Sequence, residues 1–72
     1  MKKVFKMEEL DCANCAAKME DAIRRIDGVN GATVSFMTQK LTLDVEDGRL
    51  DEVLSQAQKA CSRIERHCRI IV

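Results

Sequence analysis

Apolar and polar residues alternate along four short stretches of the chain, a pattern that predicts β-strands. In the second stretch, Phe36 would continue the inward face that begins at Ala32. In the fourth, Val72 would continue the face that begins at Cys68. The expected strands cover residues 2–8, 32–37, 41–46 and 67–72.

Two longer stretches carry apolar residues at spacings of three and four, which predicts amphipathic helices with one buried face. The first helix is expected over residues 13–26, followed by Gly28, which suits the left-handed conformation after a helix. The second is expected over residues 50–62, after a turn at residues 47–48. A further turn at residues 38–40 would join the second and third strands as a hairpin.

The order of these elements predicts an α+β fold. Each strand–helix–strand half needs a right-handed crossover. Two interlocked halves give a ferredoxin-like βαββαβ arrangement, in which a four-stranded antiparallel sheet carries both helices on one face. No proline or low-complexity linker interrupts residues 1–72, so we expect a single domain.

The charges of the chain balance, because 12 lysine and arginine residues offset 12 aspartate and glutamate residues. Nucleic-acid binding needs a basic field or stacking aromatic rings, and the chain has no Trp or Tyr and only two Phe. Its apolar runs fall short of the roughly 18 residues of a membrane span, and Glu8 interrupts the basic start before a signal-peptide core develops. We therefore expect a cytoplasmic segment that binds no nucleic acid and does not itself enter a membrane.

The candidate chemistry lies between the first strand and the first helix, where two residues separate Cys12 from Cys15. At this spacing both sulfur atoms can reach one point, and thiolates are soft ligands that suit Zn²⁺, Cd²⁺ and Cu⁺. The positive end of the helix favours thiolate over thiol. Since one cysteine pair leaves a tetrahedral ion short of two ligands, the site would be open to exchange.

Asp11, directly before the pair, bears on which ion is bound. A carboxylate oxygen suits Zn²⁺, Cd²⁺ or Pb²⁺ better than Cu⁺. Asp11 could instead cap the helix, because aspartate is a preferred N-cap residue. Beside a cysteine pair we interpret it as a third ligand, with Zn²⁺ or Cd²⁺ as the expected ion.

Glu65 and His67 are candidates for a fourth ligand, because the ferredoxin-like arrangement places the loop before the last strand beside the cysteine pair. The alternative for His67 is an edge or surface position, which is more common for a lone histidine. Leu10 is expected to point into the core and anchor the loop. Four further sulfur-containing residues lie on apolar faces and are expected to pack in the core: Met7, Met19, Cys61 and Cys68.

The four cysteines leave two other interpretations open. A two-disulfide scaffold would need an oxidising compartment, whereas a chain without an export signal is expected in a reducing one. A thiol–disulfide redox pair also fits a helix start, but a thioredoxin-type enzyme needs a larger sheet and usually an aromatic residue or proline near the motif. Metal binding is the interpretation that the pattern favours.

Residues 4–20, centred on the run Glu-Leu-Asp-Cys-Ala-Asn-Cys at 9–15, together with Ile-Asp-Gly-Val at 26–29, resemble the heavy-metal-associated domain. This family includes copper chaperones, mercury carriers and N-terminal domains of soft-metal-transporting P-type ATPases. Its copper members usually carry Gly-Met-Thr before the first cysteine. The Asp-Cys-x-x-Cys form found here is similar to that of zinc, cadmium and lead exporters, which implies a ligand role for Asp11. Glu9 replaces the family's glycine.

The resemblance implies the cytosolic N-terminal domain of a Zn²⁺/Cd²⁺/Pb²⁺-translocating P-type ATPase, which delivers the ion to the rest of the polypeptide or regulates export. The alternative is a free-standing chaperone for copper or another soft metal, which hands its ion to a partner by docking. The chain lacks a Gly-rich phosphate loop and a phosphorylated-aspartate motif, so we expect no enzymatic activity from it alone. We expect a monomer, with a metal-bridged dimer as the alternative.

Overall fold

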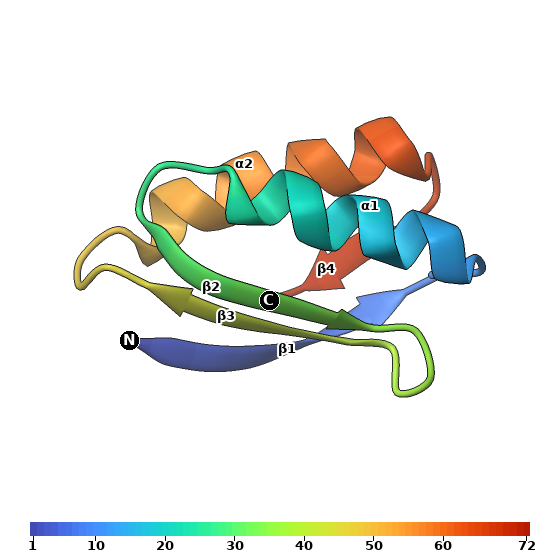
Figure 1. Cartoon of the computed structure of the whole chain (residues 1–72), viewed down its shortest axis with the longest axis horizontal. Coiled ribbons are helices and arrows are strands. Elements are labelled where there is room, and N and C mark those ends of the chain that lie inside the picture. Colours follow the sequence, from blue (N-terminus) through green and yellow to red (C-terminus); the bar gives the residue numbers. More distant parts are fainter.

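Two helices and four strands follow one another in the order β-α-β-β-α-β along residues 1–72, all of which the computed structural model describes. They are β1 (Lys2–Glu8), α1 (Ala13–Arg24), β2 (Val29–Ser35), β3 (Lys40–Val45), α2 (Leu50–Ile64) and β4 (Arg69–Ile71). The strands form one antiparallel sheet in the order β2-β3-β1-β4, and both helices cover the same face of it (Figure 1). The ferredoxin-like α+β fold is therefore confirmed. Neither helix has the length and apolar character needed to cross a membrane.

The hydrophobic core lies between the sheet and the helices, and all 14 of its buried residues are apolar or cysteine. Leu41, Leu43 and Val45 alternate inward along β3, as predicted, and none of them is exposed. Met19 and Ile23 from α1 are equally buried. Apolar burial of this kind is the main favourable term in folding, so the same packing also fixes the position of α1 relative to the sheet.

The β2–β3 hairpin turns earlier than the alternation predicts. β2 ends at Ser35, so Phe36 and Met37 lie in the turn, and Met37 is 87% exposed. The turn closes at Gln39, whose φ of 55° lies in the left-handed region, and a residue in that region helps to reverse the chain. The expectation that Phe36 continues the inward face of the strand was wrong.

Other element ends also differ from the expected ones. α1 stops at Arg24, because the backbone after it tightens into hydrogen bonds that span three residues, while α2 continues to Ile64. The last strand covers only Arg69–Ile71, and His67 lies in the turn before it. Val72 follows the end of this strand and is 86% exposed. Its predicted place on the inner face was therefore wrong.

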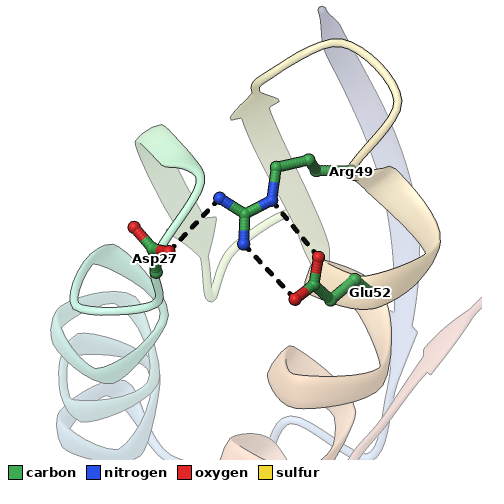
Figure 2. Close-up of polar contacts among 3 residues, drawn as sticks. All are labelled: Asp27, Arg49 and Glu52. Carbon is green, nitrogen blue, oxygen red and sulfur yellow. Dashed lines mark hydrogen bonds and ion pairs between the residues drawn. The ribbon is translucent and has the colours of Figure 1, made fainter.

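Arg49 joins the two helices at the end of the molecule remote from the β1–α1 loop. Figure 2 shows its guanidinium between Asp27, just after α1, and Glu52, in the first turn of α2. The closest nitrogen–oxygen distances are 3.3 Å to Asp27 and 3.2 Å to Glu52. Gly28 passes beside this cluster with a φ of 97°, and a Cβ atom there would lie 3.0 Å from the guanidinium. The positive φ and the close approach of the guanidinium both explain why residue 28 is a glycine.

Helix side chains take the place of a neighbouring strand at both edges of the sheet. On β4, the Gln58 amide accepts a hydrogen bond from the Ile70 N–H at 2.8 Å and donates one to the Ile70 carbonyl at 3.0 Å. On β2, a carboxylate oxygen of Glu20 accepts a hydrogen bond from the Val34 N–H at 2.9 Å. Unpaired strand edges are templates for association, and these contacts occupy part of each edge.

Candidate metal site

The cysteine pair lies where the loop after β1 enters α1. Leu10 anchors this loop as predicted, since it is only 1% exposed. Glu9 before it has a φ of 58°, in the region that glycine adopts most easily, and Asp11 after it is exposed. Figure 1 shows that the β2–β3 and α2–β4 turns lie at this same end of the molecule. Three connections therefore share the end of the molecule that carries the cysteine pair.

Cys12 is the N-cap residue of α1, with extended backbone angles of φ −139° and ψ 123°. Its Sγ accepts a hydrogen bond from the backbone N–H of Cys15 at 3.3 Å. The cap that Asp11 could have formed is thus formed by a cysteine. Both cysteines are half-buried and lie at the helix N-terminus, where the backbone supplies partial positive charge.

The two thiols differ in their acidity. The pKa of Cys12 is lowered, first by a hydrogen bond with the Cys15 side chain and then by the Cys15 backbone N–H. The pKa of Cys15 is raised to about 11, first by that same interaction with Cys12 and then by burial. Cys12 therefore ionises first, while the Cys15 thiol keeps its proton and donates it toward the neighbouring sulfur. A cation that binds both sulfurs must displace this proton.

One carboxylate acts on the cysteine pair, and two more lie in the loop before it. The charge of Glu65 adds to the causes that raise the pKa of Cys15. Burial raises the pKa of Cys68, and the charges of Glu65, Asp11 and Glu9 raise it further. No three His, Cys, Asp or Glu side chains converge closely enough to hold a metal ion. The structure thus brings the two cysteines together without a third converging ligand. We define the acidic rim as the carboxylates of the β1–α1 loop and of the residue after α2, which are Glu9, Asp11 and Glu65.

The other sulfur atoms lie in the core, as predicted for Met7, Met19, Cys61 and Cys68, which are at most 2% exposed. The Sγ of Cys68 lies 4.0 Å from the Sδ of Met19. Burial raises the pKa of Cys61 to about 12, so this thiol stays protonated and is a poor metal ligand at neutral pH. All four cysteines are free thiols. His67 is exposed in the α2–β4 turn.

One residue that contacts the loop was not found from the sequence. The side-chain amide of Gln39 donates a hydrogen bond to the Leu10 carbonyl at 2.6 Å and accepts one from the Leu10 N–H at 3.1 Å. Gln39 lies in the β2–β3 turn, 29 residues further along the chain. A glutamine in a turn gives no sequence signal for such a contact, which depends on how the sheet aligns the two connections.

The chain matches the heavy-metal-associated domain family over residues 4–65. It is similar to the zinc/cadmium/lead-transporting P-type ATPase of Escherichia coli, with 43% identity over 56 residues that cover 78% of this chain and 8% of that protein. It is also similar to the copper chaperone CopZ of Enterococcus hirae, with 31% identity over 64 residues that cover 89% of this chain and 86% of the chaperone.

Among solved structures, the solution structure of the N-terminal domain of ZntA in the apo-form has a TM-score of 0.73 and 31% identity. That comparison covers 99% of this chain and 92% of the ZntA domain. The chain thus matches only a small part of the ATPase relative, but most of the CopZ chaperone and of the ZntA domain.

Proposed function

The chain belongs to the heavy-metal-associated domain family, a family of metal-binding modules, and from that membership we propose that Cys12 and Cys15 hold a soft divalent cation. The proposed cargo is Zn²⁺ or Cd²⁺, with Pb²⁺ also fitting the site. We further propose that the chain is the cytosolic N-terminal domain of a heavy-metal-translocating P-type ATPase, in which it delivers the ion or regulates export. The cysteine pair at the start of α1 is the observation that carries this proposal.

Binding would begin at Cys12, because its lowered pKa makes it the more available thiolate. Cys15 would then lose its proton as the cation takes that proton's place between the sulfurs. Asp11 is the proposed third ligand. Of the two candidates for a fourth, we favour Glu65 over His67, because the Glu65 carboxylate already acts on the Cys15 thiol. Since no three of these donors converge in the structure, the carboxylates would move toward the cysteines as the ion binds.

The charges of the donor set favour a divalent cation. Two thiolates and one carboxylate carry three negative charges, which a divalent cation reduces to one and Cu⁺ only to two. Oxygen ligands also suit Zn²⁺ and Cd²⁺ better than Cu⁺. The acidic rim of Glu9, Asp11 and Glu65 would raise the local concentration of cations. An open, half-buried site of this kind suits an ion that must be released again.

Competitive titration with Zn²⁺, Cd²⁺, Pb²⁺ and Cu⁺ tests the donor set. We expect Asp11→Asn to weaken binding of the divalent ions by about tenfold or more while changing Cu⁺ binding much less. Glu65→Gln should have a smaller effect of the same kind, and Asp21→Asn, on the exposed side of α1, is the matched control. Equal losses for divalent ions and Cu⁺ in Asp11→Asn would remove Asp11 from the ligand set.

A free-standing metallochaperone is the second candidate, and the similarity to CopZ over 86% of that chaperone favours it. Such a protein would pass its ion to a partner by docking. The two functions are distinguished by the reading frame: continuation into hydrophobic segments after Val72 supports the transporter domain, and a stop codon there supports the chaperone. In both cases we propose that this segment alone does not hydrolyse ATP.

A further inference from the structure

We propose that Gln39 is a positioning residue for the metal-binding loop, which we define as residues 9–15. This inference rests on the function proposed above. Gln39 supplies no ligand of its own. It holds the backbone of Leu10, two residues before Cys12, and so fixes the point from which the ligand-bearing part of the loop starts.

Gln39 contacts β1 and the loop through three backbone groups. Its own carbonyl accepts a hydrogen bond from the Met7 N–H at 2.8 Å. Its Oε1 accepts one from the Leu10 N–H at 3.1 Å, and its Nε2 donates one to the Leu10 carbonyl at 2.6 Å. The same Nε2 also donates to the Phe36 carbonyl at 2.9 Å. Because both polar atoms of the amide are used, the side chain is held in one orientation.

The contact between the Gln39 side chain and Leu10 continues the β1–β3 hydrogen-bond ladder beyond the last pair of strand residues. β1 and β3 pair in register as far as Lys6 opposite Lys40, and Gln39 then turns away with a φ of 55°. Its amide presents one donor and one acceptor, the same pair of groups that a further strand residue would offer to Leu10. The start of the loop is therefore bonded as though it were still part of the sheet.

Leu10 is consequently fixed on two sides, since Gln39 holds its backbone and the core buries its side chain. Movement of the loop is then confined to the residues after Leu10, which include Asp11 and Cys12. Without the Gln39 contact the mobile segment would be longer, and more backbone freedom would be lost when an ion binds. Weaker binding and faster release follow from that loss.

The chain contains a matched control for this contact. Gln58 forms the same two-bond contact with the Ile70 backbone, but on the outer edge of β4. Replacement of either glutamine by asparagine shortens the side chain by one methylene group, which takes the amide out of reach of its partner. Asparagine also tolerates the left-handed region well, so Gln39→Asn does not add strain to the turn.

The experiment measures Cd²⁺ affinity and release rate for the wild-type chain, Gln39→Asn, Gln39→Ala and Gln58→Asn, together with unfolding in urea. We expect both Gln39 variants to bind Cd²⁺ about tenfold more weakly and to release it correspondingly faster, with Gln58→Asn within about twofold of wild type. Affinities within twofold of wild type in the Gln39 variants would overturn the positioning role. Equal losses at both glutamines would do so too, because they would mean a loss of stability only.

Hydrogen exchange of the Leu10 amide, measured in the presence of a chelator, separates this inference from the function on which it rests. Gln39→Asn should speed that exchange by about tenfold or more, and Gln58→Asn should leave it unchanged. Unchanged exchange in Gln39→Asn would show that the amide does not hold Leu10. Absence of metal uptake by the wild-type chain would instead overturn the proposed function, and with it the metal-related role of Gln39.

Discussion

The backbone N–H of Cys15 donates a hydrogen bond to the Sγ of Cys12 at 3.3 Å, so a single sulfur atom caps α1 and is also one of the two thiol ligands of the proposed metal site. Sulfur is a weak acceptor, and the cap is correspondingly easy to disturb when a cation arrives. The two roles of Cys12 can be separated by mutation, because serine is a good helix cap but a poor ligand for soft metals.

Cys12→Ser and Cys12→Ala should therefore both abolish tight Cd²⁺ binding but differ in stability. In the presence of a chelator, serine retains a cap while alanine loses it, and we expect the alanine variant to be less stable by about 1 kcal/mol. Urea unfolding of both variants measures this difference. Equal stabilities would contradict the capping role, and tight Cd²⁺ binding by either variant would contradict the ligand role.

The four thiols should react with an alkylating reagent in a definite order. Cys12 should be labelled first because its pKa is lowered, and Cys15 more slowly because its pKa is raised to about 11. Cys61 and Cys68 are buried and should react only after unfolding. Mass spectrometry after brief iodoacetamide treatment at neutral pH reports each site. Equal labelling of Cys12 and Cys15 would show that their acidities do not differ.

Stability should fall at alkaline pH because of the buried thiol of Cys61. Burial raises its pKa from 9.0 to about 12, so between these values the unfolded chain binds fewer protons than the folded one. The contribution of the Cys61 thiol to the free energy of unfolding is complete below about pH 9. It is lost as the pH rises toward about 12, at about 1.4 kcal/mol per pH unit. Urea unfolding at several pH values should show a shallower decline for Cys61→Ala.

Ser55→Ala, on the exposed side of the same helix, is the control for this pH dependence and should keep the wild-type slope. Because removal of a buried side chain lowers stability at every pH, the slopes rather than the absolute values are compared. Identical slopes in the wild type and Cys61→Ala would mean that another group causes the alkaline loss.

The parts of the fold that depend on periodic burial were predictable from the sequence. Leu41, Leu43 and Val45 alternate because β3 has one buried face, and that pattern identified the strand. The prediction extended β2 too far because Phe36 is apolar. Residue type indicates burial, but it does not reveal the φ of Gln39, which turns the chain. The prediction also placed Val72 wrongly on the inner face of the last strand. An apolar residue just beyond the end of a strand cannot be distinguished by type from a residue within it.

Only the part of the site that depends on the spacing of neighbouring residues was predictable from the sequence. Two residues between Cys12 and Cys15 bring both sulfurs to the start of α1, whatever surrounds them. The proximity of Glu65 depends on how α2 ends next to this loop, and the contact of Gln39 with Leu10 depends on sheet register. Neither is encoded in a short motif. The ligand roles of Asp11 and Glu65 remain predictions.

Glu9→Gly should stabilise the domain. Glu9 has a φ of 58°, where a residue with a Cβ atom is strained by roughly 1 kcal/mol. Glycine relieves that strain, and part of the gain is offset by greater freedom in the unfolded chain. Gly48→Ala is the converse control, because Gly48 has a φ of 81° and open space around it, so strain alone should destabilise that variant. A loss of stability in Glu9→Gly would contradict the strained geometry of the loop.

The ligand set around bound Zn²⁺ tests the central claim most directly. X-ray absorption spectroscopy of the reduced domain, loaded with one equivalent of Zn²⁺, distinguishes sulfur from oxygen neighbours by their distances from the metal. We expect two sulfur neighbours, from Cys12 and Cys15, with oxygen neighbours completing the sphere, and weaker retention of Zn²⁺ in Asp11→Ala. A sphere of three or four sulfur atoms, or no Zn²⁺ retained, would contradict a site built from two thiolates and a carboxylate.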